Sequence, residues 1–122
     1  MRAAVLVSWL IVVGACGSTA PTPTTGLAGV VVRGPVTPVC QEGVPCDAPL
    51  AAEFVVERAN RRVAGFRSGS DGRFEVRLAP GRYTVVPGRD APLLSPGQQR
   101  REVEVGPTGL TEVTLLFDTG IR

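Results

Sequence analysis

The sequence predicts a single all-β domain that follows an export leader and a short linker. Three observations indicate this fold class. Glycine and proline are frequent, at 15 and 11 of 122 residues, and they are spread along the chain. Valine dominates the apolar residues, and no apolar pattern with helical spacing runs for three turns without a glycine or proline. Short apolar runs between turn signals are typical of a β-sandwich or β-barrel.

Three strands are expected in the first half of this domain. Residues 27–33 form an apolar run that a Gly-Pro pair ends, and residues 36–48 carry prolines and two cysteines, which predicts a long loop. The run 49–57 alternates in polarity, so one of its faces is expected to be buried. A turn at 59–61 leads into a third strand, 62–68.

The next two strands are separated by clear turn signals. Asp71-Gly72 lies between two strand patterns, and this pair is a leading hairpin cue because glycine accepts the positive φ that the turn needs. Residues 73–78 then alternate, with arginine and glutamate facing outward. Ala79-Pro80-Gly81 turns the chain into a fifth strand, 82–86.

A second loop, two more strands and a turn complete the domain. Residues 87–98 are broken by prolines, residues 99–105 and 110–118 are strands, and a Gly-Pro-Thr-Gly turn separates them. Seven strands in this order fit an immunoglobulin-like or prealbumin-like β-sandwich. The side chains expected on its inner faces are Leu50, Ala52, Phe54, Val56, Ala64, Phe66, Phe74, Val76, Leu78, Tyr83, Val85, Val103, Val105, Val113, Leu115 and Phe117.

Cys16 comes directly after a sequence pattern that is typical of an export leader. Arg2 precedes an apolar stretch, Ala3–Val13, and two small residues come directly before the cysteine. A charged start, a short apolar run and small residues at the cut site are typical of a secretory signal peptide, whereas a membrane span needs about 20 apolar residues. The pattern resembles the lipobox of bacterial lipoproteins. The resemblance implies that residues 1–15 are removed and that lipid on Cys16 holds the exported chain on a bacterial membrane, at its periplasmic face or at the cell surface.

The expected domain organisation follows from the leader. Residues 16–26 carry the lipidated cysteine and a Thr/Pro-rich stretch without large apolar side chains, which predicts a flexible linker. Residues 27–122 are too few for more than one domain, so they are assigned to the β-sandwich.

Cys40 and Cys46 remain once Cys16 is lipidated. In an oxidising compartment such a pair is expected to form a disulfide that staples the loop. A metal site is the rival interpretation, but zinc normally takes four Cys, His or carboxylate ligands and the chain has no histidine. A redox site would more usually have two residues between its cysteines.

Two segments resemble the carboxypeptidase regulatory-like domains. They are Ser68-Gly69-Ser70-Asp71-Gly72-Arg73-Phe74 and Leu78-Ala79-Pro80-Gly81-Arg82-Tyr83-Thr84, and the opening Gly29–Val32 also fits the first strand of that family. The family is a prealbumin-like β-sandwich that usually serves as an accessory module. The cysteine loop and the tail 117–122 depart from its usual short form.

The motif residues have structural interpretations. Gly72 and Gly81 permit turn geometry, and Pro80 presets φ. Phe74 is expected to fill the core. Tyr83 resembles the tyrosine of a tyrosine corner, whose hydroxyl bonds to the backbone while its ring packs. Asp71 is interpreted as a turn former, with a calcium ligand as the alternative, although a calcium loop would want several more oxygens nearby.

The composition disfavours several classes of function. Without histidine the chain has no His base and no Ser-His-Asp triad. We therefore expect that the protein is not an enzyme and that it has no catalytic residue, no metal site and no cofactor. The formal net charge of +2 is too small to indicate nucleic-acid binding. A carbohydrate site is weakly supported, because the one tryptophan, Trp9, lies in the leader.

Two functions from different classes remain. The first is a non-catalytic envelope lipoprotein, a membrane-tethered module that binds a protein partner or supports an envelope structure. The second is a carbohydrate-binding-like module at the cell surface that uses the loops 36–48 and 87–98.

Overall fold

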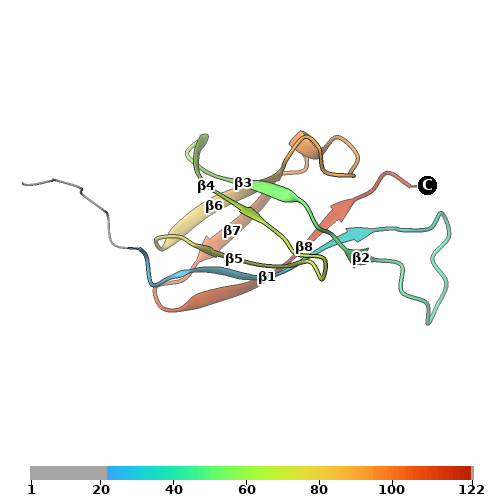
Figure 1. Cartoon of the computed structure of the whole chain (residues 1–122), viewed down its shortest axis with the longest axis horizontal. Helices are drawn as coiled ribbons and strands as arrows, with labels where there is room; N and C mark the ends of the chain where they lie inside the picture. Colours follow the sequence, from blue (N-terminus) through green and yellow to red (C-terminus); the bar gives the residue numbers. More distant parts are fainter. Residues whose placement is uncertain (1–21, 122) are drawn as a thin grey trace, which may run out of the picture.

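The computed structural model describes residues 22–121, which form two β-sheets packed face to face (Figure 1). Among these residues the one helical element is a short 3₁₀ turn, η1 (Pro96–Gln98). The strands are β1 (Gly26–Gly34), β2 (Ala48–Pro49), β3 (Glu53–Arg58), β4 (Arg61–Arg67), β5 (Arg73–Arg77), β6 (Gly81–Pro87), β7 (Arg101–Val105) and β8 (Leu110–Asp118). The all-β class and the sandwich arrangement are as the sequence predicts.

The first sheet is built around β1. Strand β8 runs parallel to β1 along its whole length, with Gly26 opposite Leu110 and Gly34 opposite Asp118. The other edge of β1 is shared by two antiparallel strands: β5 pairs with its first half and β2 with its last residues. This sheet therefore joins the first and the last strand of the domain, so neither end of the fold is held by local contacts alone.

The second sheet has the order β4-β3-β6-β7, and all its pairings are antiparallel. Ala59 and Asn60 take positive φ angles of 51° and 62° in the tight turn between β3 and β4. Such a turn matches the right-handed twist of the strands that it joins. The hairpin β3–β4 and the hairpin β6–β7 are thus set side by side in one antiparallel layer.

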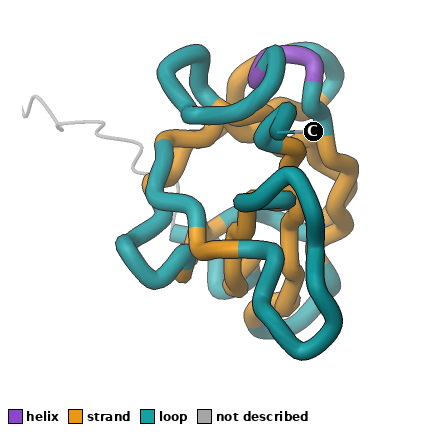
Figure 2. The backbone as a smooth tube through the Cα atoms, turned by 90° about the vertical axis from the view of Figure 1, so that its right-hand side faces the viewer, coloured by secondary structure: helices purple, strands orange, loops and turns teal. Residues whose placement is uncertain are grey.

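The core lies between the sheets, which surround it when the molecule is viewed from the end that carries the cysteine loop (Figure 2). The predicted inner faces are correct: each of those side chains is buried or packs against the buried cluster. Four phenylalanine rings cross the core in contact: Phe74 stacks on Phe66 at 4.4 Å between centroids, Phe66 on Phe54 at 5.1 Å, and Phe54 meets Phe117 at 5.5 Å. The row links both sheets.

The strand count is eight, not seven, because the expected strand 49–57 is divided. Its first residue, Pro49, belongs to β2 in one sheet and its last residues belong to β3 in the other, while Leu50–Ala52 cross between the sheets. Ser68 holds this crossing: its buried hydroxyl donates to the carbonyl of Leu50 at 2.5 Å and accepts from the N–H of Ala52 at 3.0 Å.

The folded domain begins slightly before the expected boundary at Leu27. Strand β1 starts at Gly26, and the buried Thr25 donates its hydroxyl to the carbonyl of Leu78 at 2.6 Å. The last residues of the expected linker are therefore part of the sandwich. The expected signal peptide, Cys16 and the first part of the linker lie outside the described residues.

Candidate functional site

The turn motif around Asp71 has a structural role. Gly72 takes a φ of +78°, and a Cβ at this position would collide with the carbonyl oxygen of Val31. That close approach lets Val31 donate its N–H to the Gly72 carbonyl at 2.8 Å. The Asp71 carboxylate accepts the N–H of Arg73 at 3.0 Å, so its oxygen closes the turn. Phe74 then enters the core.

The second motif, Pro80-Gly81-x-Tyr83, is equally structural. The Tyr83 hydroxyl donates to the carbonyl of Ala79 at 2.6 Å while the ring is buried. Arg58 covers the same ring at 5.3 Å from its centroid and donates to the tyrosine oxygen at 3.4 Å. A tyrosine held in this way fixes a corner of the fold and is not offered to a ligand.

The cysteine loop is closed by a disulfide between Cys40 and Cys46, whose Cα atoms lie 5.5 Å apart. The Val36 N–H donates to the Cys46 carbonyl at 2.8 Å, and the Val44 N–H donates to the Gln41 carbonyl at 3.1 Å. The disulfide is as the sequence predicts. Together with these hydrogen bonds it gives the long, proline-rich loop a defined shape.

Both long loops lie at one end of the sandwich, which we call the disulfide end (Figure 1). The C-terminal tail ties them together. Thr119 donates its hydroxyl to the carbonyl of Pro35 at 2.6 Å, at the start of the cysteine loop. On the other side of the tail, the Gln99 side chain donates to the carbonyls of Leu94 and Asp118 at 2.6 and 2.8 Å. The sequence gives no signal for this tail contact, because its partners are far away along the chain.

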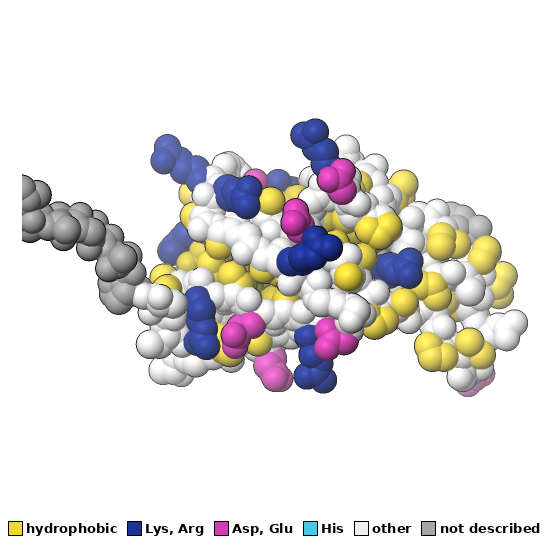
Figure 3. Space-filling view, in the orientation of Figure 1, with side chains coloured by type: hydrophobic (Ala, Val, Ile, Leu, Met, Phe, Trp, Pro, Cys, Tyr) yellow, Lys and Arg dark blue, Asp and Glu magenta, His cyan; other side chains and the backbone are white. Residues whose placement is uncertain are grey.

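The disulfide end carries most of the exposed large apolar side chains of residues 22–121. Exposed fractions are 71% for Val39, 57% for Val44, and 50% for both Leu94 and Leu116. Cys40 lines two adjacent hollows here, of about 380 and 460 Å³, and Leu116 lines the larger one. In Figure 3, hydrophobic side chains, drawn in yellow, are frequent at the right-hand end of the molecule. An apolar surface of this kind, set on a stapled loop, is typical of protein interaction sites.

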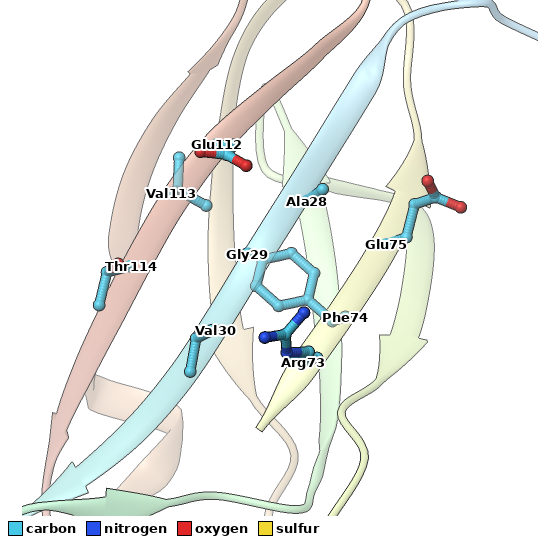
Figure 4. Close-up of a pocket in the computed structure, with 9 residues that line it drawn as sticks. All are labelled: Ala28, Gly29, Val30, Arg73, Phe74, Glu75, Glu112, Val113 and Thr114. Atoms are coloured by element: carbon cyan, nitrogen blue, oxygen red, sulfur yellow. The ribbon is translucent and has the colours of Figure 1, made fainter. Parts of the chain in front are cut away.

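A further hollow, of about 590 Å³, lies on the first sheet and is lined from β1, β5 and β8 (Figure 4). Ala28 lies in register with Glu75 on one side and Glu112 on the other, and Val30 lies between Arg73 and Thr114. Small side chains of the central strand thus form the floor between longer side chains of its neighbours. The ion pair of Glu75 with Arg77, at 3.7 Å, is part of this solvated face.

Three kinds of feature are absent from the described residues. Among residues 22–121 there is no group of three or more Cys, His, Asp or Glu side chains that could hold a metal ion. The five aromatic rings of this region are all buried or half-buried, so its loops offer no exposed ring on which a sugar could stack. Within the same range no helix has the length and apolarity to span a bilayer.

The solved structures that are similar to this chain include two DUF3823 family proteins. One is a DUF3823 family protein from Bacteroides ovatus, 18% identical, with a TM-score of 0.50 over 75% of this chain and 44% of that one. The other is a DUF3823 family protein from Parabacteroides merdae, 20% identical, with a TM-score of 0.50 over 79% of this chain and 46% of that one. At such identities the likeness concerns the fold alone, and this chain covers less than half the length of either protein. No protein-family model and no curated protein matches the chain.

Proposed function

We propose that the chain is a non-catalytic lipoprotein of the bacterial cell envelope, exported by the signal in residues 1–15 and tethered through lipid on Cys16. Its prealbumin-like sandwich, of the carboxypeptidase regulatory-like kind, is a module that binds a protein partner. The leader pattern supports the export and the tether, and the Cys40–Cys46 disulfide supports an oxidising compartment.

The observation that carries the binding role is the position of the exposed apolar side chains. The chain enters the sandwich at one end, and the disulfide end with Val39, Val44 and Leu116 lies at the other (Figure 1). A tethered module of this form presents the disulfide end away from its point of attachment. Loops on a rigid scaffold are the usual carriers of binding function, and an apolar patch with a polar rim is the usual form of a protein-binding surface.

Paired substitutions on the loop test the binding role. Val39→Ser together with Val44→Ser removes the two most exposed apolar side chains of the disulfide end. Val63→Ser is the matched control, since Val63 is 49% exposed but lies on β4. After cross-linking in intact cells, we expect the double variant to lose a protein adduct that the natural chain and Val63→Ser both form. The same adducts in all three chains would contradict the proposal.

A separate assay tests the non-catalytic part. We expect the purified chain to show no turnover in a broad esterase, peptidase and glycosidase screen. The loop acids Glu42, Asp47, Asp71 and Asp90 are the candidate groups to change to alanine. Turnover that one of these changes abolishes would show that the module is an enzyme.

A further inference from the structure

The end of the sandwich opposite the disulfide end is lined by arginine. Five exposed arginines occupy it, and we call this surface the arginine pole: Arg58, Arg61, Arg62, Arg77 and Arg82. Arg58 and Arg61 face each other across the β3–β4 turn. Arg58 also lies against Gly81, next to Arg82, and the two arginines line one hollow of about 170 Å³ together with Glu57 and Glu102. Dark blue side chains at the left-hand end of Figure 3 show this gathering.

Most arginines of this pole form no ion pair within the described residues. Arg77 is the one member with an ion pair there, to Glu75 at 3.7 Å. Arg58 engages the Tyr83 ring, and Arg82 lies opposite Glu104 in register without an ion pair. Glu57, the nearest acid to the β3–β4 turn, is paired with Arg100 of another segment. Arg61, Arg62 and Arg82 therefore have no ion pair among the described residues, and their guanidinium groups are available to an external anion.

The chain enters the domain at the same pole. Arg77 donates to the carbonyl of Thr24 at 3.3 Å, and the first strand residue, Gly26, pairs with Arg77 across the sheet. From Cys16 to Thr25 there are nine residue steps, which can span at most about 30 Å. A lipid on Cys16 would thus keep the arginine pole near the membrane surface and let it approach within the Debye length, about 8–10 Å at physiological salt.

We propose that the arginine pole binds the anionic headgroups of the membrane that holds the lipid of Cys16; this inference rests on the proposed function. Guanidinium groups suit the site because they bind phosphate oxygens through paired N–H donors. One lipid chain with a basic patch is a known combination for stable attachment. Binding at this pole turns the disulfide end, with Val39 and Val44, towards the solvent.

Vesicle binding by a chain without lipid tests this surface directly. The protein starts at residue 16 and carries Cys16→Ser, because residues 22–121 contain both sheets and the whole buried core. The vesicles are pure phosphatidylcholine or an equimolar mixture with phosphatidylglycerol, at low and at high sodium chloride concentration. We expect binding to the anionic vesicles at low salt only, because electrostatic attraction to lipid headgroups is screened.

Two matched pairs of substitutions locate the binding. Arg61→Glu with Arg62→Glu should weaken binding at least tenfold, since each basic residue near an anionic surface contributes about fivefold. Arg67→Glu with Arg89→Glu makes the same change in net charge at the disulfide end and should change binding less than about twofold. Arg82→Gln, which leaves the turn intact, should weaken binding about fivefold. Thermal melts establish that each variant is folded.

The possible results separate this inference from the lipid anchor. Equal loss in both charge-reversed pairs, binding that does not depend on phosphatidylglycerol, or no binding at low salt would each overturn the arginine-pole proposal. None of these results tests the lipid anchor on Cys16, because the chain used with the vesicles carries no lipid. A failure of lipidation in cells would, in turn, leave the vesicle measurement fully interpretable.

Discussion

Removing the Phe74 ring should destabilise the domain strongly. Phe74 lies on β5, is 7% exposed, and stacks on Phe66 of the opposite sheet with 4.4 Å between ring centroids. Phe66 in turn stacks on Phe54, so Phe74 is the first ring of the row that joins the two sheets. A Phe→Ala change at a buried site costs about 3–5 kcal/mol. For a domain of this size each kcal/mol shifts the melting temperature by roughly 4–8 °C, so we expect a fall of at least about 12 °C.

Arg73→Ala is the matched control for this prediction. Its side chain is 80% exposed and points to the other face of the same strand, and its ion pair with Asp71 spans 3.8 Å. Exposed pairs of this kind contribute little, so the change should cost less than about 0.5 kcal/mol. Thermal and urea melts of both variants give the comparison. Equal losses, or a larger loss for Arg73→Ala, would mean that the assigned faces of β5 are reversed.

Three further predictions concern the crossing, the parallel pairing and the loop. Ser68→Ala should cost about 1–3 kcal/mol in urea melts, because it leaves buried backbone groups unpaired, whereas exposed Ser70→Ala should be near neutral. Gly29→Ala should destabilise the fold, because a Cβ at this position would collide with the backbone of β8. Gly97→Ala is the control, since there is open space around Gly97. If Gly29→Ala left the unfolding free energy unchanged, the pairing of β1 with β8 would be refuted. Reduction of the disulfide should raise the intact mass by two hydrogens and lower the unfolding free energy by only about 2 kcal/mol. Two free thiols in freshly purified protein would contradict the Cys40–Cys46 disulfide.

The sequence predicts the buried faces well because alternation is a local property. Side chains on a strand point to opposite faces in turn, so the pattern of Phe74 and its neighbours is enough to assign the inner face. The same property hides the division of the segment 49–57. Leu50 and Ala52 face the core that both sheets share, so the alternation continues without a break while the chain passes from one sheet to the other.

Features that depend on distant partners could not be predicted. Strand β8 pairs with β1 in parallel although the whole domain separates them, and no local pattern specifies such a pairing. Thr25 looks like part of a linker, but its hydroxyl bonds to Leu78, which is 53 positions away. The same holds for the candidate site: the sequence identifies both long loops, whereas the contact of Thr119 with Pro35, 84 positions apart, sets how the tail lies between them.

The intact mass of the protein extracted from cell membranes tests the lipid anchor. We expect a chain that begins at Cys16 and carries the added mass of acyl groups, and we expect Cys16→Ser to abolish both the added mass and the membrane association. A chain that retains residues 1–15, or one that begins elsewhere and has no lipid, would show that the protein is not anchored through Cys16.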